Sequence, residues 1–178
     1  LLERWSPRAM SGEGLSQDEL DTLFEAARWA PSCFNEQPWR FLYAHRDSPE
    51  WPLFFDLLVQ ANQAWAENAG VLITVVSKMT FSHNSRPNAS HSLDAGAAWE
   101  NLALQASSMG LVAHGMAGFD HDKARADLNI PEDYSVEVMI AVGRPGDPTR
   151  LPVQLLERER PSSRLEVAKI SIQGRFCV

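Results

Sequence analysis

The feature that most constrains this chain is residues 30–39, a stretch that holds two prolines, two aromatic rings and two side-chain amides. Pro31 and Pro38 each fix the backbone φ angle and lack an N–H donor, so we predict a rigid loop between a helix and a strand. Such a loop can present backbone groups and small side chains to a flat ligand. Alternatively, it is a connector whose Asn35 and Gln37 only satisfy its own backbone. The loop alone favours neither interpretation.

The composition limits the class of protein. A chain of 178 residues can form one domain with a sizeable core but is too short for two ordinary domains. Its hydrophobic fraction of 44% and charged fraction of 22% are typical of globular proteins. It has no run of 18 apolar residues and no visible signal peptide, so we expect no membrane association and a cytoplasmic location. Residue 1 is leucine, which leaves open whether the natural chain begins earlier.

The charge and the cysteines exclude several kinds of site. The net charge of −7 argues against a nucleic-acid or anionic-membrane partner, so an anionic ligand would need a few local arginines. Cys33 and Cys177 are too few for a disulfide framework or a metal cluster. We therefore expect no metal.

Hydrophobic periodicity predicts the main elements. Ser16 and Glu19 form a capping box that opens an amphipathic helix ending at residue 29. We expect further helices over residues 47–62, 92–109 and 121–129, and strands over residues 40–45, 71–77 and 136–142. The alternation around Ile170 and Ile172 predicts another strand in the tail. Residues 1–5 are interpreted as the end of a helix, and residues 79–90 as irregular.

Two cations and a hydroxyl lie close together near the N-terminus, in Arg4-Trp5-Ser6-Pro7-Arg8. Guanidinium groups and a serine hydroxyl are suitable donors for a phosphate, because charge-assisted hydrogen bonds to an anion are strong. The alternative is a solvated helix end, where cations are favoured by the helix dipole. By itself the segment favours this second interpretation.

The helix predicted over residues 92–109 is apolar nearly all round, so we expect it to be buried. Its small residues, among them Gly96 and Ala97, permit a close approach to another helix. Downstream, the glycines of residues 115–118 would let the backbone approach a ring closely, and Asp120 is a suitable cap for the next helix. A simple glycine turn is the alternative.

Six segments, taken in order, resemble the nitroreductase family of FMN-dependent oxidoreductases. They are R-x-S-x-R at residues 4–8, A-P-S-x-x-N-x-Q-P-W at 30–39, N-x-x-W-x-x-N-A at 62–69, S-L-D-A-G-A-A-x-x-N-L-x-L-x-A-x-x-x-G-L at 92–111, G-F-D at 118–120 and P-S-S-R at 161–164. The resemblance implies one α+β domain over residues 1–178, with a central, mostly antiparallel sheet flanked by helices. It also implies an intertwined homodimer with FMN at the interface and a tail, about residues 165–178, that extends onto the partner.

The resemblance further implies the residues of the cofactor site. Arginines and a serine would hold the FMN phosphate and ribityl chain, the proline loop would line the site of the other subunit, Asn62 would address the polar edge of the flavin, and backbone groups of Ala117 and Gly118 would face N5. The implied cofactor contacts are Arg4, Ser6, Arg8, Pro31, Ser32, Cys33, Phe34, Asn62, Met116, Ala117, Gly118, Arg144 and Arg164.

In this family NADH or NADPH delivers a hydride to flavin N5 and leaves, and a nitroaromatic, quinone or similar acceptor then takes the electrons. No protein acid, base or nucleophile is needed, so we assign none, and Cys33 is expected only to line the pocket. Three alternatives stay open: another reaction of reduced FMN, such as dehalogenation or flavin fragmentation; a non-catalytic FMN sensor or store; and a plain α+β scaffold protein in which the motifs are coincidental.

Overall fold

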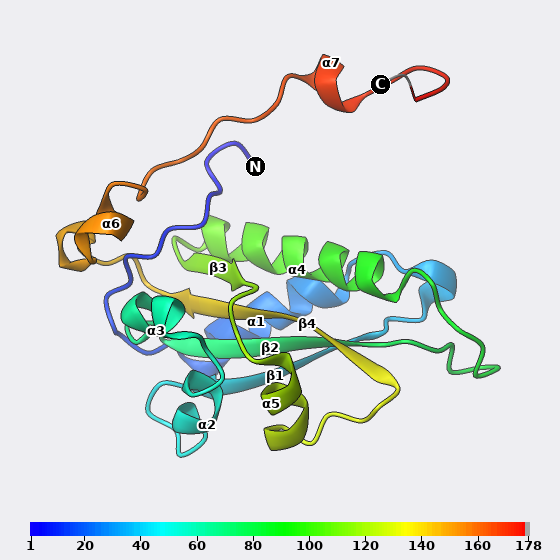
Figure 1. The fold of residues 1–178 in the computed structure, drawn as a ribbon, viewed down its shortest axis with the longest axis horizontal. Coiled ribbons are helices and arrows are strands. Elements are labelled where there is room, and N and C mark those ends of the chain that lie inside the picture. Colours follow the sequence, from blue (N-terminus) through cyan, green and yellow to red (C-terminus); the bar gives the residue numbers. More distant parts are fainter. Residues whose placement is uncertain (177–178) are drawn as a thin grey trace.

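The computed structural model describes residues 1–176, and its centre is a four-stranded sheet with the order β1-β2-β4-β3 (Figure 1). The strands are β1 (Trp39–His45), β2 (Val71–Lys78), β3 (Val112–Met116) and β4 (Tyr134–Gly143), and every neighbouring pair is antiparallel. The structure therefore confirms the α+β class and the predicted strands β1, β2 and β4. The short strand β3 was not predicted.

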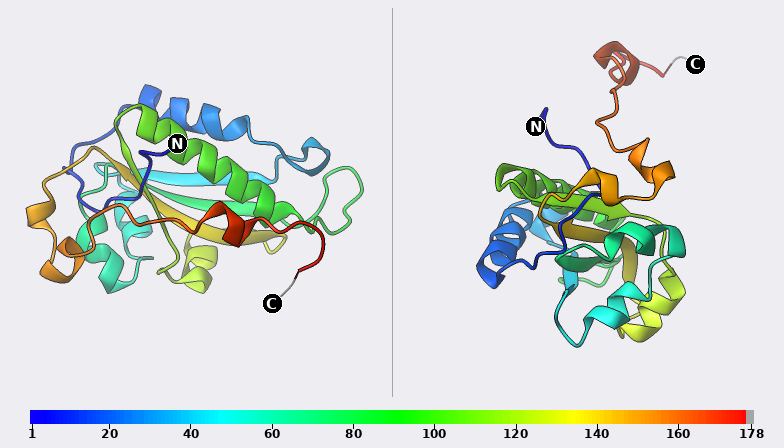
Figure 2. Two further views of the ribbon diagram at one scale, coloured as in Figure 1. Left: turned by 90° about the horizontal axis from the view of Figure 1, so that it is seen from above. Right: turned by 90° about the vertical axis from the view of Figure 1, so that its left-hand side faces the viewer.

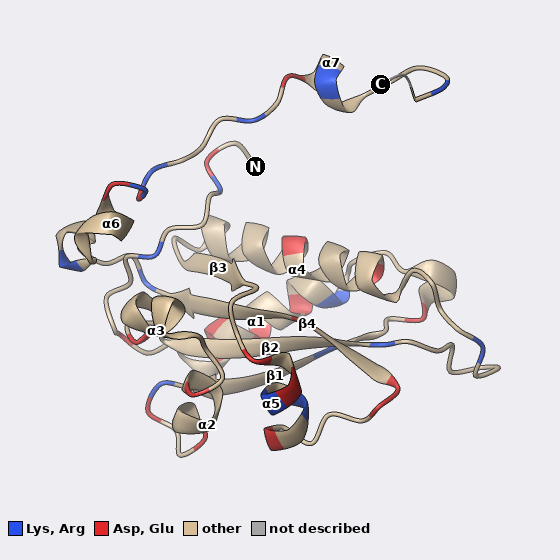
Figure 3. Cartoon of the chain, viewed as in Figure 1, with Lys and Arg blue, Asp and Glu red and all other residues tan. Residues whose placement is uncertain are grey.

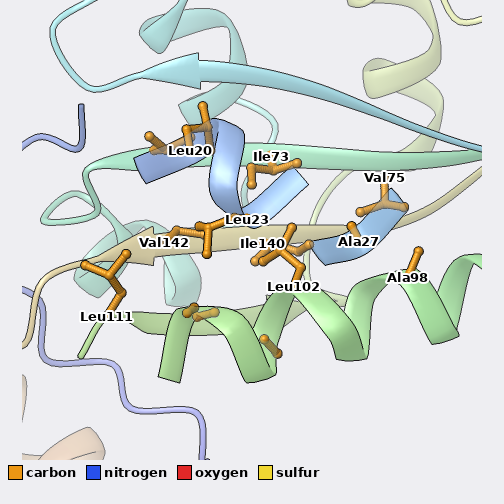
Figure 4. Close-up of a cluster of buried hydrophobic side chains, with 14 of the residues drawn as sticks. Leu20, Leu23, Ala27, Ile73, Val75, Ala98, Leu102, Leu111, Ile140 and Val142 are labelled. Carbon is orange, nitrogen blue, oxygen red and sulfur yellow. The ribbon is translucent and has the colours of Figure 1, made fainter. Parts of the chain in front are cut away.

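Helices cover both faces of the sheet (Figure 2). Helices α1 (Gln17–Arg28) and α4 (His91–Ser108) lie on one face, and α2 (Trp51–Phe55), α3 (Gln60–Ala66) and α5 (His121–Asp127) lie on the other. Because side chains alternate along a strand, β2 turns Ile73 and Val75 toward α1 and α4 and turns Leu72 toward the opposite layer (Figure 4). Each layer thus has its own apolar core.

Two of the helices begin as the sequence predicts. Glu19 N–H donates to Ser16 Oγ over 3.3 Å, and Ser16 N–H donates to Glu19 Oε2 over 2.9 Å, which completes the capping box of α1. At α5, Lys123 N–H donates to Asp120 Oδ1 over 2.9 Å. These predictions are confirmed because the capping groups are local in sequence.

The helix predicted over residues 47–62 is wrong, since the chain forms two short helices, α2 and α3, separated by residues 56–59. Leu58 pairs with Phe119 in an isolated bridge, and Val59 N–H donates to Gly118 O over 3.1 Å. These long-range backbone contacts replace helical hydrogen bonds. Asn62 consequently lies near the start of α3 rather than at the end of a longer helix.

Within a single chain helix α4 is buried on one face only, and burial of its other face stays a prediction that depends on a second subunit. Ala95, Ala98 and Leu102 pack against the sheet, whereas Leu93 is 77% exposed. The helix lies in an outer layer (Figure 2). On its outer side Glu100 lies 3.9 Å from Arg4 of the N-terminal segment, whereas Leu93 and Gly96 stay exposed.

The C-terminal segment leaves the body of the molecule after η2 (Pro148–Arg150) and α6 (Val153–Leu156) (Figure 1). The strand predicted around Ile170 and Ile172 is wrong, because residues Val167–Ile170 form the short helix α7. A strand needs a neighbour for its backbone hydrogen bonds, and no described strand of this chain lies beside α7. The end of the predicted tail, including Cys177, lies outside the described residues.

Within residues 1–176, no helix is long and apolar enough to cross a bilayer, and no three His, Cys, Asp or Glu side chains are grouped to hold a metal ion.

Candidate functional site

A pocket of about 340 Å³ lies where the N-terminal segment, β3 and the C-terminal segment meet. Five arginines line it, although the chain as a whole carries a net charge of −7. We call it the arginine pocket, and its lining residues are Arg4, Trp5, Ser6, Arg8, His114, Arg158, Arg160, Ser162 and Arg164. Figure 3 shows the basic positions along both terminal segments.

The N-terminal segment reaches the pocket as extended chain, so the helix end predicted over residues 1–5 is wrong. Arg4, Ser6 and Arg8 line the arginine pocket, Glu3, Pro7 and Ala9 line a second cavity of about 350 Å³, and the large side chain of Trp5 borders both. Successive side chains of an extended chain point to opposite sides, which explains the alternation. The spacing R-x-S-x-R is itself a period-two signal, since a helix would keep Arg4 and Arg8 on one face but turn Ser6 to the opposite face.

The same signal recurs in the C-terminal segment. Arg158, Arg160, Ser162 and Arg164 alternate along the sequence, and all four line the arginine pocket. Sequence reasoning identified Arg164 but missed Arg158 and Arg160. The alternation of basic residues was the pattern that could have found them.

The guanidinium groups of the pocket are held by local contacts. Arg4 Nη1 donates to Ser6 Oγ over 3.3 Å, and its Nε lies 3.9 Å from Glu100 Oε1. Arg164 Nη1 donates to Ser162 O over 2.9 Å and to Ser162 Oγ over 3.0 Å. The pocket thus combines cations with two serine hydroxyls, a set of donors that suits a phosphate.

His114 forms the wall of the pocket contributed by β3. Its Nδ1–H donates to the Pro7 carbonyl oxygen over 3.0 Å. Burial lowers the pKa of the imidazole below its ordinary value of 6.5, although the hydrogen bond to Pro7 acts in the opposite direction. His114 is therefore neutral at pH 7 and adds no charge to the arginine pocket.

A continuous set of contacts joins the arginine pocket to the loop after β3. The Arg8 guanidinium lies 6.0 Å from the centre of the Trp65 ring, which in turn lies 4.7 Å from the ring of His114. Trp65 Nε1–H donates to Asn62 Oδ1 over 3.3 Å, and Asn62 Nδ2–H donates to Gly118 O over 2.9 Å. The structure thus connects Asn62 and Gly118 with the predicted phosphate residues.

Around Gly118 the site is closely packed. A Cβ atom at this position would lie 2.7 Å from Asn62 Nδ2 and 3.0 Å from Val59 Cγ2. The φ angle of Gly118 is outside the left-handed region, so the requirement for glycine is one of space. Beside it, the side chain of Met116 is buried under the sheet and Ala117 is exposed.

The proline loop lies at the opposite end of the sheet from the arginine pocket (Figures 1 and 2). It contains η1 (Cys33–Asn35), Cys33 N–H donates to Asp94 Oδ2 over 3.1 Å, and Gln37 N–H donates to Ser32 Oγ over 3.0 Å. Phe34 is 84% exposed, and its ring contacts Phe81 edge-on at 5.8 Å. Within the described chain, Pro31, Ser32, Cys33 and Phe34 are not brought to the arginine pocket.

Arg144 is also placed elsewhere. Its Nη2 donates to Glu19 Oε1 over 2.9 Å, and its Nε lies 3.5 Å from Glu13 Oε2. It is not among the residues that line the arginine pocket. Its guanidinium instead ties the end of β4 to the start of α1.

Comparison with known proteins agrees with this geometry. The sequence model of the nitroreductase family matches residues 1–144. A solved structure described as an oxidoreductase containing FMN is 49% identical, with a TM-score of 0.95, and the match covers 99% of this chain and 90% of that one. A provisionally assigned nitroreductase from Desulfovibrio desulfuricans, solved in complex with FMN, is 26% identical with a TM-score of 0.74, over 99% of this chain and 95% of that one.

Sequence relatives point the same way. A protein from Archaeoglobus fulgidus, provisionally named NADH dehydrogenase/NAD(P)H nitroreductase, is 28% identical over 153 residues, which are 81% of this chain and 82% of the relative. A 15.4 kDa protein from Mycolicibacterium smegmatis is 32% identical over 120 residues, 67% of this chain and 80% of the relative. The family match, the fold and the order of the site residues agree, and the chain belongs to the nitroreductase family.

Proposed function

We propose that this protein is an FMN-dependent oxidoreductase that takes a hydride from NADH or NADPH and reduces a nitroaromatic, quinone or similar acceptor. One observation carries the proposal. Five arginines and two serines from the two ends of an acidic chain line a single pocket, in a protein whose relative at 49% identity contains FMN.

The residues present fit the phosphate end of FMN. A phosphate monoester carries up to two negative charges and three acceptor oxygens, and the pocket offers guanidinium groups together with the Ser6 and Ser162 hydroxyls. Arg4, Ser6, Arg8 and Arg164 would hold the phosphate, as the family resemblance implies, and Arg158 and Arg160 would add to them. Since the chain is acidic overall, this local charge is specific to the site.

The residues beyond the pocket fit the flavin ring. Asn62 uses one N–H and one lone pair of its amide within the chain, so its other N–H and lone pair are left for the polar edge of a ring. The glycine at position 118 keeps the backbone of residues 117 and 118 uncovered by its own side chain. We infer that these backbone groups contact the ring near N5.

Bound FMN would supply the redox chemistry, by accepting a hydride from the nicotinamide and passing two electrons to the acceptor. The protein's own part is to bind and orient. Residues 116–119 contain no acid or base, and His114 is held neutral, so we assign no side chain to proton transfer. Positioning alone can contribute a large part of a rate enhancement when the reacting atoms lie about 3–3.5 Å apart.

We further propose that the site is completed in a homodimer. The proline loop lies too far along the sheet to reach the arginine pocket of its own chain, and its Phe34 ring is exposed (Figure 1). A second subunit would bring Pro31, Ser32, Cys33 and Phe34 to that pocket's ligand, and the tail would extend onto the partner. A single domain over residues 1–178 and a cytoplasmic location belong to the same proposal.

Anaerobic reduction is the test. Purified protein reconstituted with FMN is mixed with NADH or NADPH without air, and flavin absorbance is followed before and after adding a quinone or nitroaromatic. Bleaching followed by recovery is expected. Protein that binds FMN but is not bleached would be a sensor or store, bleaching without recovery would point to another reaction of reduced FMN, and failure to bind FMN would refute the proposal.

A further inference from the structure

Glu159 is a carboxylate that joins the two ends of the chain. Its Oε1 accepts hydrogen bonds from Arg8 N–H over 2.6 Å and from Ala9 N–H over 2.8 Å, across about 150 residues of sequence. The side chain is only 2% exposed. Burying a carboxylate costs free energy unless the group is hydrogen-bonded and close to a cation. Glu159 has both kinds of partner, so its contact with the N-terminal segment is a specific part of the fold.

The neighbours of Glu159 face the other way. Arg158 and Arg160 line the arginine pocket, whereas Glu159 lines the second cavity, together with Pro7 and Ala9 of the N-terminal segment. Glu159 therefore binds the N-terminal segment by hydrogen bonds, while Arg158 and Arg160 on either side of it face the arginine pocket. The position of the pocket's C-terminal cations depends on those hydrogen bonds.

Arg8 interacts with Glu159 through both its backbone and its side chain. Its backbone N–H is bound by Oε1, and its guanidinium Nη1 lies 3.9 Å from Oε2. Oε2 has no hydrogen-bond partner within the described residues, so its negative charge acts on Arg8 across that distance. The two short hydrogen bonds to Oε1 thus fix where the Arg8 main chain runs, and the more distant charge on Oε2 is the weaker of the two contacts.

We propose that Glu159 is a positioning residue for phosphate recognition: it latches the C-terminal segment onto the N-terminal segment, and the arginine pocket is complete only while the latch is closed. The inference rests on the proposed function in taking the phosphate of FMN as the ligand. Because each segment contributes part of the anion site, phosphate binding and closure of the latch must favour each other.

The first measurement separates phosphate recognition from folding. FMN and riboflavin affinities are titrated for wild type, Glu159→Ala, Glu159→Gln and Glu157→Ala. Glu157 is an exposed acid two residues away, so Glu157→Ala removes the same charge without touching the latch. Glu159→Ala should weaken FMN binding at least tenfold and riboflavin binding less than threefold, while Glu159→Gln, which keeps an acceptor oxygen, and Glu157→Ala should both stay within threefold of wild type.

The second measurement reports the latch itself. Trypsin can cut after Arg158 and Arg164 when the C-terminal segment is released, and FMN or inorganic phosphate should slow both cuts in wild type. That protection should be lost in Glu159→Ala and kept in Glu159→Gln. If Glu159→Ala does not fold, Glu159→Asp replaces it, because the shorter side chain withdraws the acceptor from both N–H groups.

Equal losses of FMN and riboflavin affinity in Glu159→Ala, or unchanged FMN affinity, would overturn the latch. So would phosphate protection that is the same in Glu159→Ala and wild type. Wild-type protein that binds no FMN but is protected by inorganic phosphate, with the protection lost in Glu159→Ala, would refute the proposed function and keep the latch.

Discussion

The amide of Asn62 occupies the space where a side chain at position 118 would lie: Asn62 Nδ2 donates to Gly118 O over 2.9 Å, and a Cβ atom on Gly118 would come within 2.7 Å of the same nitrogen. Asn62 therefore both donates a hydrogen bond to the backbone of residue 118 and leaves no space for a side chain at that position. This pair couples the geometry of the loop after β3 to helix α3.

We expect Gly118→Ala to destabilise the protein by about 1–3 kcal/mol, because the added methyl overpacks a closed space. Gly118→Val should cost more and should also weaken FMN binding. Gly14 is the matched control, since its nearest neighbour to a Cβ is Asp47 Oδ2 at 4.0 Å. Gly14→Ala should change the free energy of unfolding by less than about 0.5 kcal/mol. Urea unfolding measures both, and similar costs at the two glycines would contradict the packing argument.

Arg164→Ala should weaken FMN binding by about 1.5–3 kcal/mol, the usual contribution of a hydrogen bond to a charged group. That loss is roughly ten- to hundred-fold in Kd. Riboflavin, which lacks the phosphate, should bind wild type and variant with similar weakness. Arg144→Ala is the control, because Arg144 is paired with Glu13 and Glu19 outside the pocket, and it should leave FMN affinity unchanged. Equal loss of both flavins in Arg164→Ala would assign Arg164 to the fold instead.

Flavin reduction should not depend on a titrating side chain. His114→Ala and Cys33→Ser should each stay within tenfold of wild type in stopped-flow reduction by NADH or NADPH, a barrier change under about 1.4 kcal/mol. The reason is that residues 116–119 contain no acid or base. A collapse of the rate in His114→Ala with FMN still bound would instead identify His114 as a proton donor.

His114 should make stability depend on pH. Burial lowers the pKa of the folded-state imidazole below its ordinary 6.5, so as the pH falls through 6.5 the unfolded chain takes up a proton that the folded chain does not. The contribution of neutral His114 to the free energy of unfolding is fully present above pH 6.5, and it is lost as the pH falls toward the folded-state pKa. Urea unfolding between about pH 5 and pH 7.5 should show this slope, and His114→Gln should flatten it. An equal slope in both proteins would show that other groups cause it.

Removing the tail should shift the protein from dimer to monomer. The tail exposes Leu165, Val167, Ile170 and Ile172 close together, and α4 exposes Leu93. We expect a second subunit to cover this apolar surface. Sedimentation of the full chain and of a chain ending at residue 164 measures the shift at micromolar concentration. An FMN-loaded monomer of the full chain would contradict the proposed dimer.

The elements that could be predicted from the sequence are those whose signals are local. Ser16 and Glu19 cap α1 by themselves, and the apolar run of β2 needs no knowledge of its neighbours. The break between α2 and α3 was missed because its cause, the bond from Val59 N–H to Gly118 O, is distant in sequence. The strand predicted in the tail failed for a similar reason, because a strand needs a distant partner. No described strand of this chain lies beside residues Val167–Ile170, which form α7 instead.

In the candidate site, too, residues with a local sequence signal could be predicted and residues defined by distant contacts could not. The motif at residues 4–8 identified three lining residues of the arginine pocket, although it was assigned to a helix end. Glu159 carries no motif, because its role is defined by backbone N–H groups about 150 residues away. Only the folded chain shows which acid among the alternating residues of the C-terminal segment faces inward.

Because side chains of the N-terminal segment alternate between two cavities, the number of residues between Arg4 and Arg8 determines which of them reach the arginine pocket. Deleting one residue between Arg4 and Arg8 would move the downstream part of the motif to the other side of the segment, so one of the two arginines would leave the arginine pocket and a neighbour such as Pro7 would take its place. An insertion of two residues would keep every side chain on its original side. The segment should therefore tolerate changes of even length better than changes of odd length, whatever residues are added.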